Sequence, residues 1–192
     1  MERKDFLKNS FGLIGFGSAF LTAFTKSTEE TVKTTSSENG PCTVTDSETD
    51  GAYPLYNSRG SSIQRLDITN GKTGIPLNIN ISIRNVNNDC GLVSNGQVKF
   101  GSIYPGWYAG RVTHIHAQVH VDDSLKLTTQ IAFPEEINTA AYNCRMHATH
   151  GQNPTKNTTD NITRDSLDNE LATVTANSSG GYDLVLTIYI YA

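Results

Sequence analysis

The alternation of apolar and polar residues in the second half of the chain predicts short strands. Period-two alternation over short lengths is typical of half-buried β-strands, and Asn-Gly and Gly-Gly dipeptides favour turns beside them. The alternating runs cover residues 79–83, 97–100, 114–121, 127–133, 171–174 and 184–190. No window shows a helical face and no internal repeat is visible. We therefore expect an all-β fold, a sandwich or a barrel.

The N-terminal segment predicts an export signal. Residues 1–24 combine a basic start with an apolar run from Phe11 to Phe24 that is too short to span a membrane comfortably. Residues 3–8, RKDFLK, resemble a twin-arginine signal with lysine in place of the second arginine. An ordinary secretory signal is the alternative. We expect an extracytoplasmic bacterial protein, periplasmic or secreted, without a membrane span in its mature form.

The remaining sequence divides into a linker and one domain. Residues 25–41 are rich in Ser, Thr, Glu and Lys, which predicts a disordered linker. Residues 42–192 then leave about 150 residues, enough for one core. Within them, the polar stretch 138–169 predicts a long loop, a flap over a site. Three cysteines, Cys42, Cys90 and Cys144, permit one disulfide and leave one free thiol. The sequence does not indicate which two are paired.

Charge indicates a small-molecule partner. The formal net charge is −4, and the basic residues are scattered rather than gathered on one face. Because a nucleic-acid binder needs a basic patch, nucleic acid is excluded as a partner.

His114 and His116 are the strongest candidate metal ligands. Alternate residues of a strand share a face, so the two side chains stand about 6.6 Å apart and point the same way. Two imidazoles so placed can close on one ion at about 2.1 Å each. The alternative is a pair of polar residues on a solvated strand face. His120 falls on the same face but too far along for a compact site, and we interpret it as a structural or rim residue.

Two residues just before this strand extend the candidate site. Tyr108 lies six positions before His114, and a loop can fold its phenol back onto the imidazoles. Phenolate is a hard anionic ligand that favours ferric iron. Arg111 would lie beside the same pocket and could hold an anion. Their alternatives are an aromatic that covers the edge of the sandwich and a surface ion pair.

Residues 105–119, PGWYAGRVTHIHAQV, together with residues 128–134, TTQIAFP, resemble the signature of the intradiol ring-cleavage dioxygenases, the protocatechuate and catechol type. Weaker similarity to extracytoplasmic members covers nearly everything after Pro41. The resemblance implies a β-sandwich of the intradiol dioxygenase type and a non-haem Fe(III) cofactor. It also implies an aromatic diol and O2 as substrates, with O2 inserted between the two hydroxyl-bearing carbons.

The resemblance also implies a role for each site residue. Tyr108, His114 and His116 correspond to metal ligands, and Tyr108 corresponds to the tyrosine that leaves the iron and takes a proton when the diol binds. Arg111 corresponds to the arginine that stabilises negative charge on the substrate. Gln130 is similar to a glutamine that supports the ligands. Tyr108, Arg111 and Gln130 are therefore the expected catalytic residues.

One departure from the family concerns the second tyrosine ligand. The chain passes directly from residues 86–90 to residues 91–97, as though an internal segment with several strands were deleted. No tyrosine matches the missing ligand, although Tyr53, Tyr56 and Tyr104 are alternatives. Loss of one phenolate weakens ferric binding and lets divalent metals compete. A non-catalytic protein that binds a metal or an aromatic diol is therefore the second hypothesis, and a zinc hydrolase the third.

Overall fold

The computed structural model describes residues 42–51 and 64–192. All of them belong to one compact unit, Asn39–Ala192. The expected export signal, the expected linker, Tyr53 and Tyr56 lie outside the described residues.

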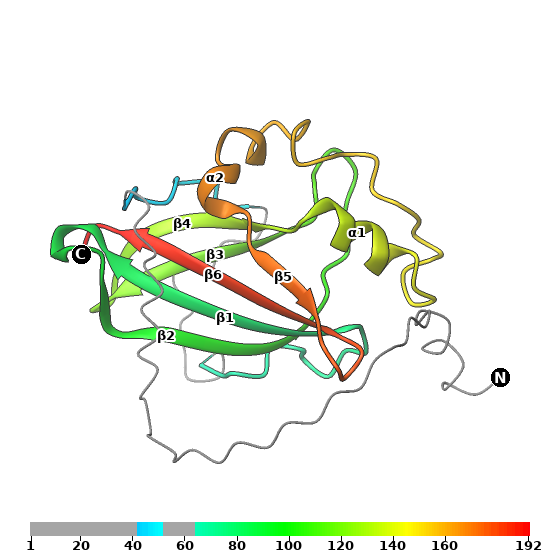
Figure 1. The fold of residues 1–192 in the computed structure, drawn as a ribbon, viewed down its shortest axis with the longest axis horizontal. Helices are drawn as coiled ribbons and strands as arrows, with labels where there is room; N and C mark the ends of the chain where they lie inside the picture. The colour runs from blue at the N-terminus through cyan, green and yellow to red at the C-terminus, as the bar shows by residue number, and fades with distance from the viewer. Residues whose placement is uncertain (1–41, 52–63) are drawn as a thin grey trace, which may run out of the picture. The chain divides into compact units, whose positions relative to one another are not determined.

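A four-stranded sheet forms the larger layer of this unit (Figure 1). Its strands are β1 (Pro76–Asn85), β2 (Gly91–Ile103), β5 (Thr173–Ala176) and β6 (Tyr182–Ile190), in the order β2-β1-β6-β5. The pair β1–β6 is parallel, and the other two pairs are antiparallel. The two central strands alternate strictly on one face, and their buried residues include Leu77, Ile79, Ile81, Leu184, Leu186 and Ile188.

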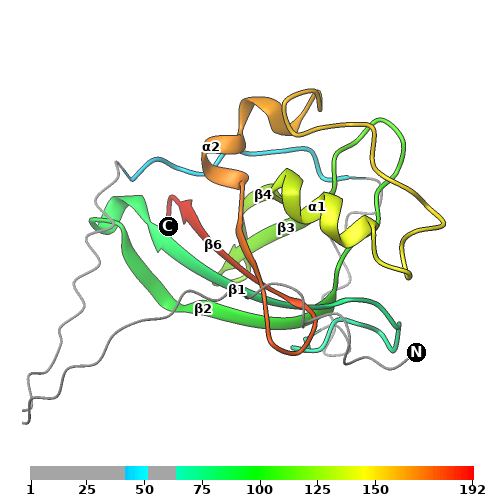
Figure 2. The ribbon, with the colours of Figure 1, turned by 45° about the vertical axis from the view of Figure 1, so that its right-hand side comes forward.

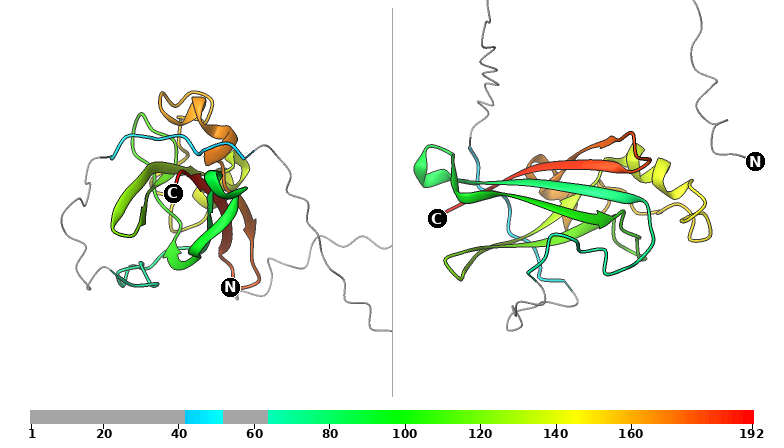
Figure 3. Two further views of the ribbon diagram at one scale, coloured as in Figure 1. Left: turned by 90° about the vertical axis from the view of Figure 1, so that its left-hand side faces the viewer. Right: turned by 90° about the horizontal axis from the view of Figure 1, so that it is seen from below.

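A separate hairpin, β3 (His114–Val121) and β4 (Ser124–Ala132), forms the second layer (Figures 1 and 3). Its apolar side chains, among them Val119, Leu127 and Ile131, join the isoleucines and leucines of the larger sheet in one core. The all-β architecture expected from the sequence is confirmed. That strands are missing from the sandwich stays a prediction.

The segment 42–51 ties the two layers together. The N–H of Thr45 donates to the carbonyl of Tyr189 on β6 at 3.0 Å, and the N–H of Glu48 donates to the carbonyl of Thr128 on β4 at 2.8 Å. At its start, Cys42 is disulfide-bonded to Cys90, and Cys144 is a free thiol. A structural disulfide is typical of an oxidising compartment.

Two short helices and one 3-10 turn lie at the two ends of the polar stretch that the sequence predicted to be a long loop, and residues 143–162 form neither helix nor strand. They are α1 (Glu135–Tyr142), η3 (Thr163–Asp165) and α2 (Leu167–Glu170), and another 3-10 turn, η2 (Val86–Asn88), precedes β2. These short helices occur although no window of the sequence shows a helical face. Figure 2 shows the segment between α1 and α2 beside the loop that precedes β3. No helix in the described residues is both long enough and apolar enough to span a membrane.

Candidate metal centre

The two histidines of β3 converge on one point. Their Nε2 atoms lie 3.2 Å apart, and the hydroxyl of Tyr108 lies 3.5 Å from the Nε2 of His114. Two ligands bound at about 2.1 Å to one ion, at a right angle to each other, would stand about 3.0 Å apart. The spacing of the two imidazoles therefore fits joint coordination of a metal ion.

A backbone hydrogen bond fixes the proton of the first imidazole. The Nδ1 of His114 lies 2.6 Å from the carbonyl oxygen of Val112, which can only accept, so Nδ1 carries the hydrogen and Nε2 keeps its lone pair. Burial lowers the pKa of His114 to about 4, and the charge of Arg111 acts in the same direction. Burial and Arg111 also lower the pKa of His116. Both rings are thus neutral near pH 7, the form that binds metals.

Gly51 lies against the second imidazole. Its φ of +75° is in the left-handed region that glycine favours, and a Cβ added there would lie 2.7 Å from the Nε2 of His116. Any other residue at this position would therefore displace the ring. The end of segment 42–51 therefore forms part of the site.

Arg111 is held in place by a buried carboxylate. Its Nε donates to Oδ2 of Asp160 at 2.8 Å and its Nη2 donates to Oε1 of Gln130, while the side chains of Arg111 and Asp160 are 15% and 0% exposed. Asp160 also accepts from the N–H of Val112 at 2.7 Å and of Thr163 at 3.0 Å. Burial opposes its ionisation, but these donors prevail and lower the pKa of Asp160 to about 2. The alternative of a surface ion pair for Arg111 was therefore wrong, because the pair is buried.

Gln130 lies directly opposite His116 in the β3–β4 ladder and is fully buried. Its N–H and the hydroxyl of Thr129 donate to Oε1 of Glu170, and the hydroxyl of Ser166 donates to Oε2 at 2.6 Å. Burial raises the pKa of Glu170. This second buried carboxylate fixes the backbone of β4 behind the histidines. The sequence predicted a role for neither Asp160 nor Glu170.

Similarity to known proteins is found in structure rather than in sequence. No protein-family model and no curated protein matches the chain. An intradiol ring-cleavage dioxygenase from Tetranychus urticae superposes with a TM-score of 0.68 at 19% identity, over 78% of this chain and 95% of the other. The chain has the fold of the intradiol ring-cleavage dioxygenases. A further dioxygenase superposes with a TM-score of 0.67 at 18% identity, over 78% of this chain and 95% of the other.

The intradiol dioxygenase fold is also found in a bacterial neighbour. The dioxygenase domain of a dioxygenase and carbohydrate-binding protein fusion from Streptomyces sp. SirexAA-E superposes with a TM-score of 0.56 at 19% identity, over 78% of this chain and 99% of the other. All three neighbours are dioxygenases by name. At these identities the likeness concerns the fold, and the chemistry has to be argued from the site.

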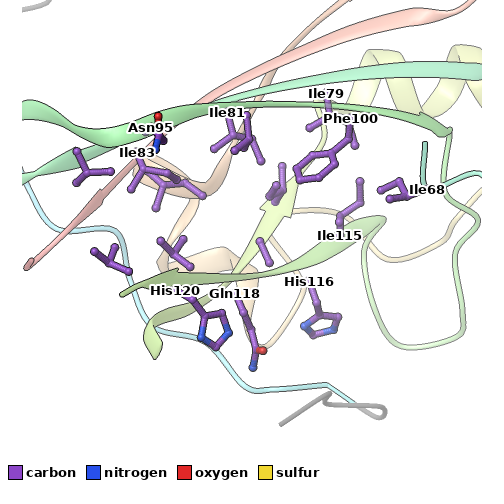
Figure 4. A pocket seen from close by; sticks show the side chains of 18 of the residues that line it. Ile68, Ile79, Ile81, Ile83, Asn95, Phe100, Ile115, His116, Gln118 and His120 are labelled. Atoms are coloured by element: carbon purple, nitrogen blue, oxygen red, sulfur yellow. The ribbon is translucent and has the colours of Figure 1, made fainter. Parts of the chain in front are cut away.

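Within this intradiol dioxygenase fold, Tyr104 is not a metal ligand. It is 2% exposed, and its hydroxyl donates to Oδ1 of Asn138 in the core at 2.7 Å. His120 lies further along β3 than the pair, as expected (Figure 4). No cluster of three or more His, Cys, Asp or Glu side chains in the described part of the chain could hold a metal ion. The candidate donor set among the described residues is therefore two imidazoles and one phenol, which would fit a ferric or divalent ion with positions open to other ligands.

Proposed function

We propose that the chain is a non-haem iron protein of the intradiol dioxygenase type that cleaves catechol-like aromatic diols with O2. The observation that carries this proposal is the convergence of two neutral imidazoles and one phenol at the start of β3, with Nε2 atoms 3.2 Å apart. The fold shared with dioxygenases supports it. Both oxygen atoms would enter the product, and the bond between the two hydroxyl-bearing carbons would break.

Tyr108, His114 and His116 would hold the metal. Ferric iron, when bound, would supply the Lewis acidity that lets the diol lose its hydroxyl protons, and the deprotonated diol is electron-rich enough to react with O2. Tyr108 is 56% exposed, so its phenol can move away from the histidines and take a proton from the entering diol. Arg111 would stabilise the negative charge that develops on the ring, because Asp160 and Gln130 hold its guanidinium beside the histidines.

A second candidate function is binding without cleavage. The candidate donor set among the described residues supports it, since Tyr108 is the one candidate that could supply an anionic ligand to a ferric ion. A site with less anionic charge binds ferric iron more weakly and admits divalent metals. Such a protein would hold a metal or a diol without turnover.

We also propose that the protein works in an oxidising, extracytoplasmic compartment. The bond between Cys42 and Cys90 supports this, because disulfides are rare in reducing compartments. The export signal expected in residues 1–24 would deliver it there.

Metal analysis and visible spectroscopy of the purified protein, followed by oxygen uptake with catechol, separate these functions. We expect about one iron per chain, a ferric–phenolate charge-transfer band, and consumption of one O2 per catechol. A coloured iron protein that takes up no oxygen would support binding without cleavage. A colourless protein containing zinc or no metal would refute the iron site.

Variants test the ligand assignment. The double variant His114→Ala/His116→Ala should lose its metal, and Tyr108→Phe should lose the charge-transfer band. His120→Ala is the matched control, because it removes an imidazole from the same strand outside the converging group. Unchanged metal content in the double variant would show that the site lies elsewhere.

A further inference from the structure

An apolar cavity lies between the two layers of the fold. Its volume is about 600 Å³, within the range of pockets for small molecules. Isoleucines of β1, among them Ile79 and Ile81, form one wall, with Phe100 of β2 beside them, and Ile115 of β3 forms the facing wall (Figure 4). The cavity therefore lies between the four-stranded sheet and the β3–β4 hairpin.

The cavity adjoins the candidate metal centre, because both use β3 and His116 is among the residues that line the cavity. Successive side chains of a strand point to opposite faces. Figure 4 shows Ile115 on the cavity side of β3 and His116, Gln118 and His120 on the other side. A molecule in the cavity would therefore contact the back of the strand that carries the histidines.

The chemistry of the walls restricts what can occupy this space. Just over half of the lining residues are isoleucine or valine, and the polar lining residues are Ser94 and Asn95 of β2 and His116, Gln118 and His120 of β3. Asp122 adds a carboxylate to the lining, and no Lys or Arg of the described residues lines it. Burial of an anionic group here would be costly, because it would lack a cationic partner. Apolar surface is instead favourable.

We infer that this cavity is a binding site for one uncharged, largely hydrocarbon small molecule. The ligand places its apolar body between β1 and β3 and any single hydroxyl or carbonyl at the Ser94 and Asn95 end. The inference does not rest on the proposed oxygenase function, although His116 belongs to both the metal centre and the cavity lining.

Two fluorescent probes that share one ring system test this inference with the full chain. N-phenyl-1-naphthylamine is uncharged, whereas 8-anilinonaphthalene-1-sulfonate adds a sulfonate to the same rings. We expect saturable binding of one uncharged probe per chain, at least about tenfold tighter than the anionic probe, and a rise in Tm with probe concentration. Equal or tighter binding of the sulfonate, or no saturable binding of either probe, would overturn the inference.

Cavity-filling variants locate the probe. Ala117→Phe on β3 and Val98→Phe on β2 each add a ring to an opposite wall, and each should weaken binding of the uncharged probe at least about tenfold. Val185→Phe is the matched control, because Val185 is 52% exposed on β6 and lies outside the cavity lining. Near-ultraviolet circular dichroism identifies variants that keep their fold. Unchanged probe affinity in a folded cavity variant, or a concentration-dependent dimer that excludes the probe, would refute the site.

Discussion

Replacement of Asp160 by asparagine tests the support of Arg111 most directly. The carboxylate is fully buried, accepts from the guanidinium at 2.8 Å, and also accepts from three backbone N–H groups, those of Val112, Ile162 and Thr163. Its pKa of about 2, against an ordinary value of 3.8, means that the ionised form stabilises the folded chain by about 2 kcal/mol at neutral pH. Removal of one partner from a buried ion pair costs about 3–5 kcal/mol. Because the asparagine oxygen can keep part of the backbone bonds, we expect a loss of about 3 kcal/mol.

The effect of Asp160→Asn on the free energy of unfolding should depend on pH. A carboxyl whose pKa is lowered by folding contributes stability that is fully present above its unfolded pKa and is lost as the pH falls through its folded pKa. The stability difference between wild type and Asp160→Asn should therefore be constant above about pH 5 and should shrink between about pH 4 and pH 2. Urea unfolding followed by far-ultraviolet circular dichroism across this range measures it.

The matched control is Asp165→Asn. Asp165 also pairs with an arginine, Arg164, but at 3.5 Å and with a side chain that is 79% exposed. Its replacement should change the free energy of unfolding by less than about 0.5 kcal/mol. A loss below about 1 kcal/mol for Asp160→Asn at pH 7, or a loss that stays the same down to pH 2.5, would refute the reasoning.

Three other predictions concern the site and its frame. Gly51→Ala should lower the metal content, because the added Cβ would meet the imidazole of His116. Gly71→Ala is the control and should keep the metal, because Gly71 has a similar φ of +70° but no atom lies within 4 Å of the added Cβ. Equal metal content in the two variants would contradict this. Because burial lowers the pKa of His114 to about 4, metal content should stay constant down to about pH 5 and fall only below it, so loss already near pH 6.5 would be inconsistent with the buried ring. Serine at both Cys42 and Cys90, which are 48 residues apart, should reduce the free energy of unfolding by about 4 kcal/mol in denaturant titrations, and a reductant should reproduce the effect in the wild type.

The sequence predicted the strands well where one face is buried and the other is not. The strand at 114–121 has its predicted bounds, the run at 79–83 is the centre of β1, and the run at 184–190 covers all but the first two residues of β6. Helix α1 was missed because it is only eight residues long and begins with two glutamates. A buried face of so few residues leaves no periodic signal for a sequence window to detect.

The histidine pair was predictable because its spacing is local, whereas its supports were not. Asp160 is 49 residues from Arg111, and it lies in a stretch whose polar composition indicated a solvated loop. Polar side chains in this stretch are buried because they form hydrogen bonds with backbone groups. The side-chain amide of Asn153, for example, donates to the carbonyl of Arg111 at 2.9 Å. Polar composition alone does not distinguish a flap from a segment that is fixed by buried hydrogen bonds.

The candidate ligands lie on β3 and in the loop before it, and the four-stranded sheet carries none of them. A two-stranded hairpin is marginally stable alone, and this one depends on packing and on a few ties, such as the bond from Ala172 N–H to the carbonyl of Ala132 at 3.0 Å. The larger sheet, in contrast, holds its own register through β1 and β6. Substitutions in the hairpin can therefore alter the ligands or their geometry while the sheet still folds. This arrangement lets the site diverge during evolution, or be redesigned, on an unchanged frame.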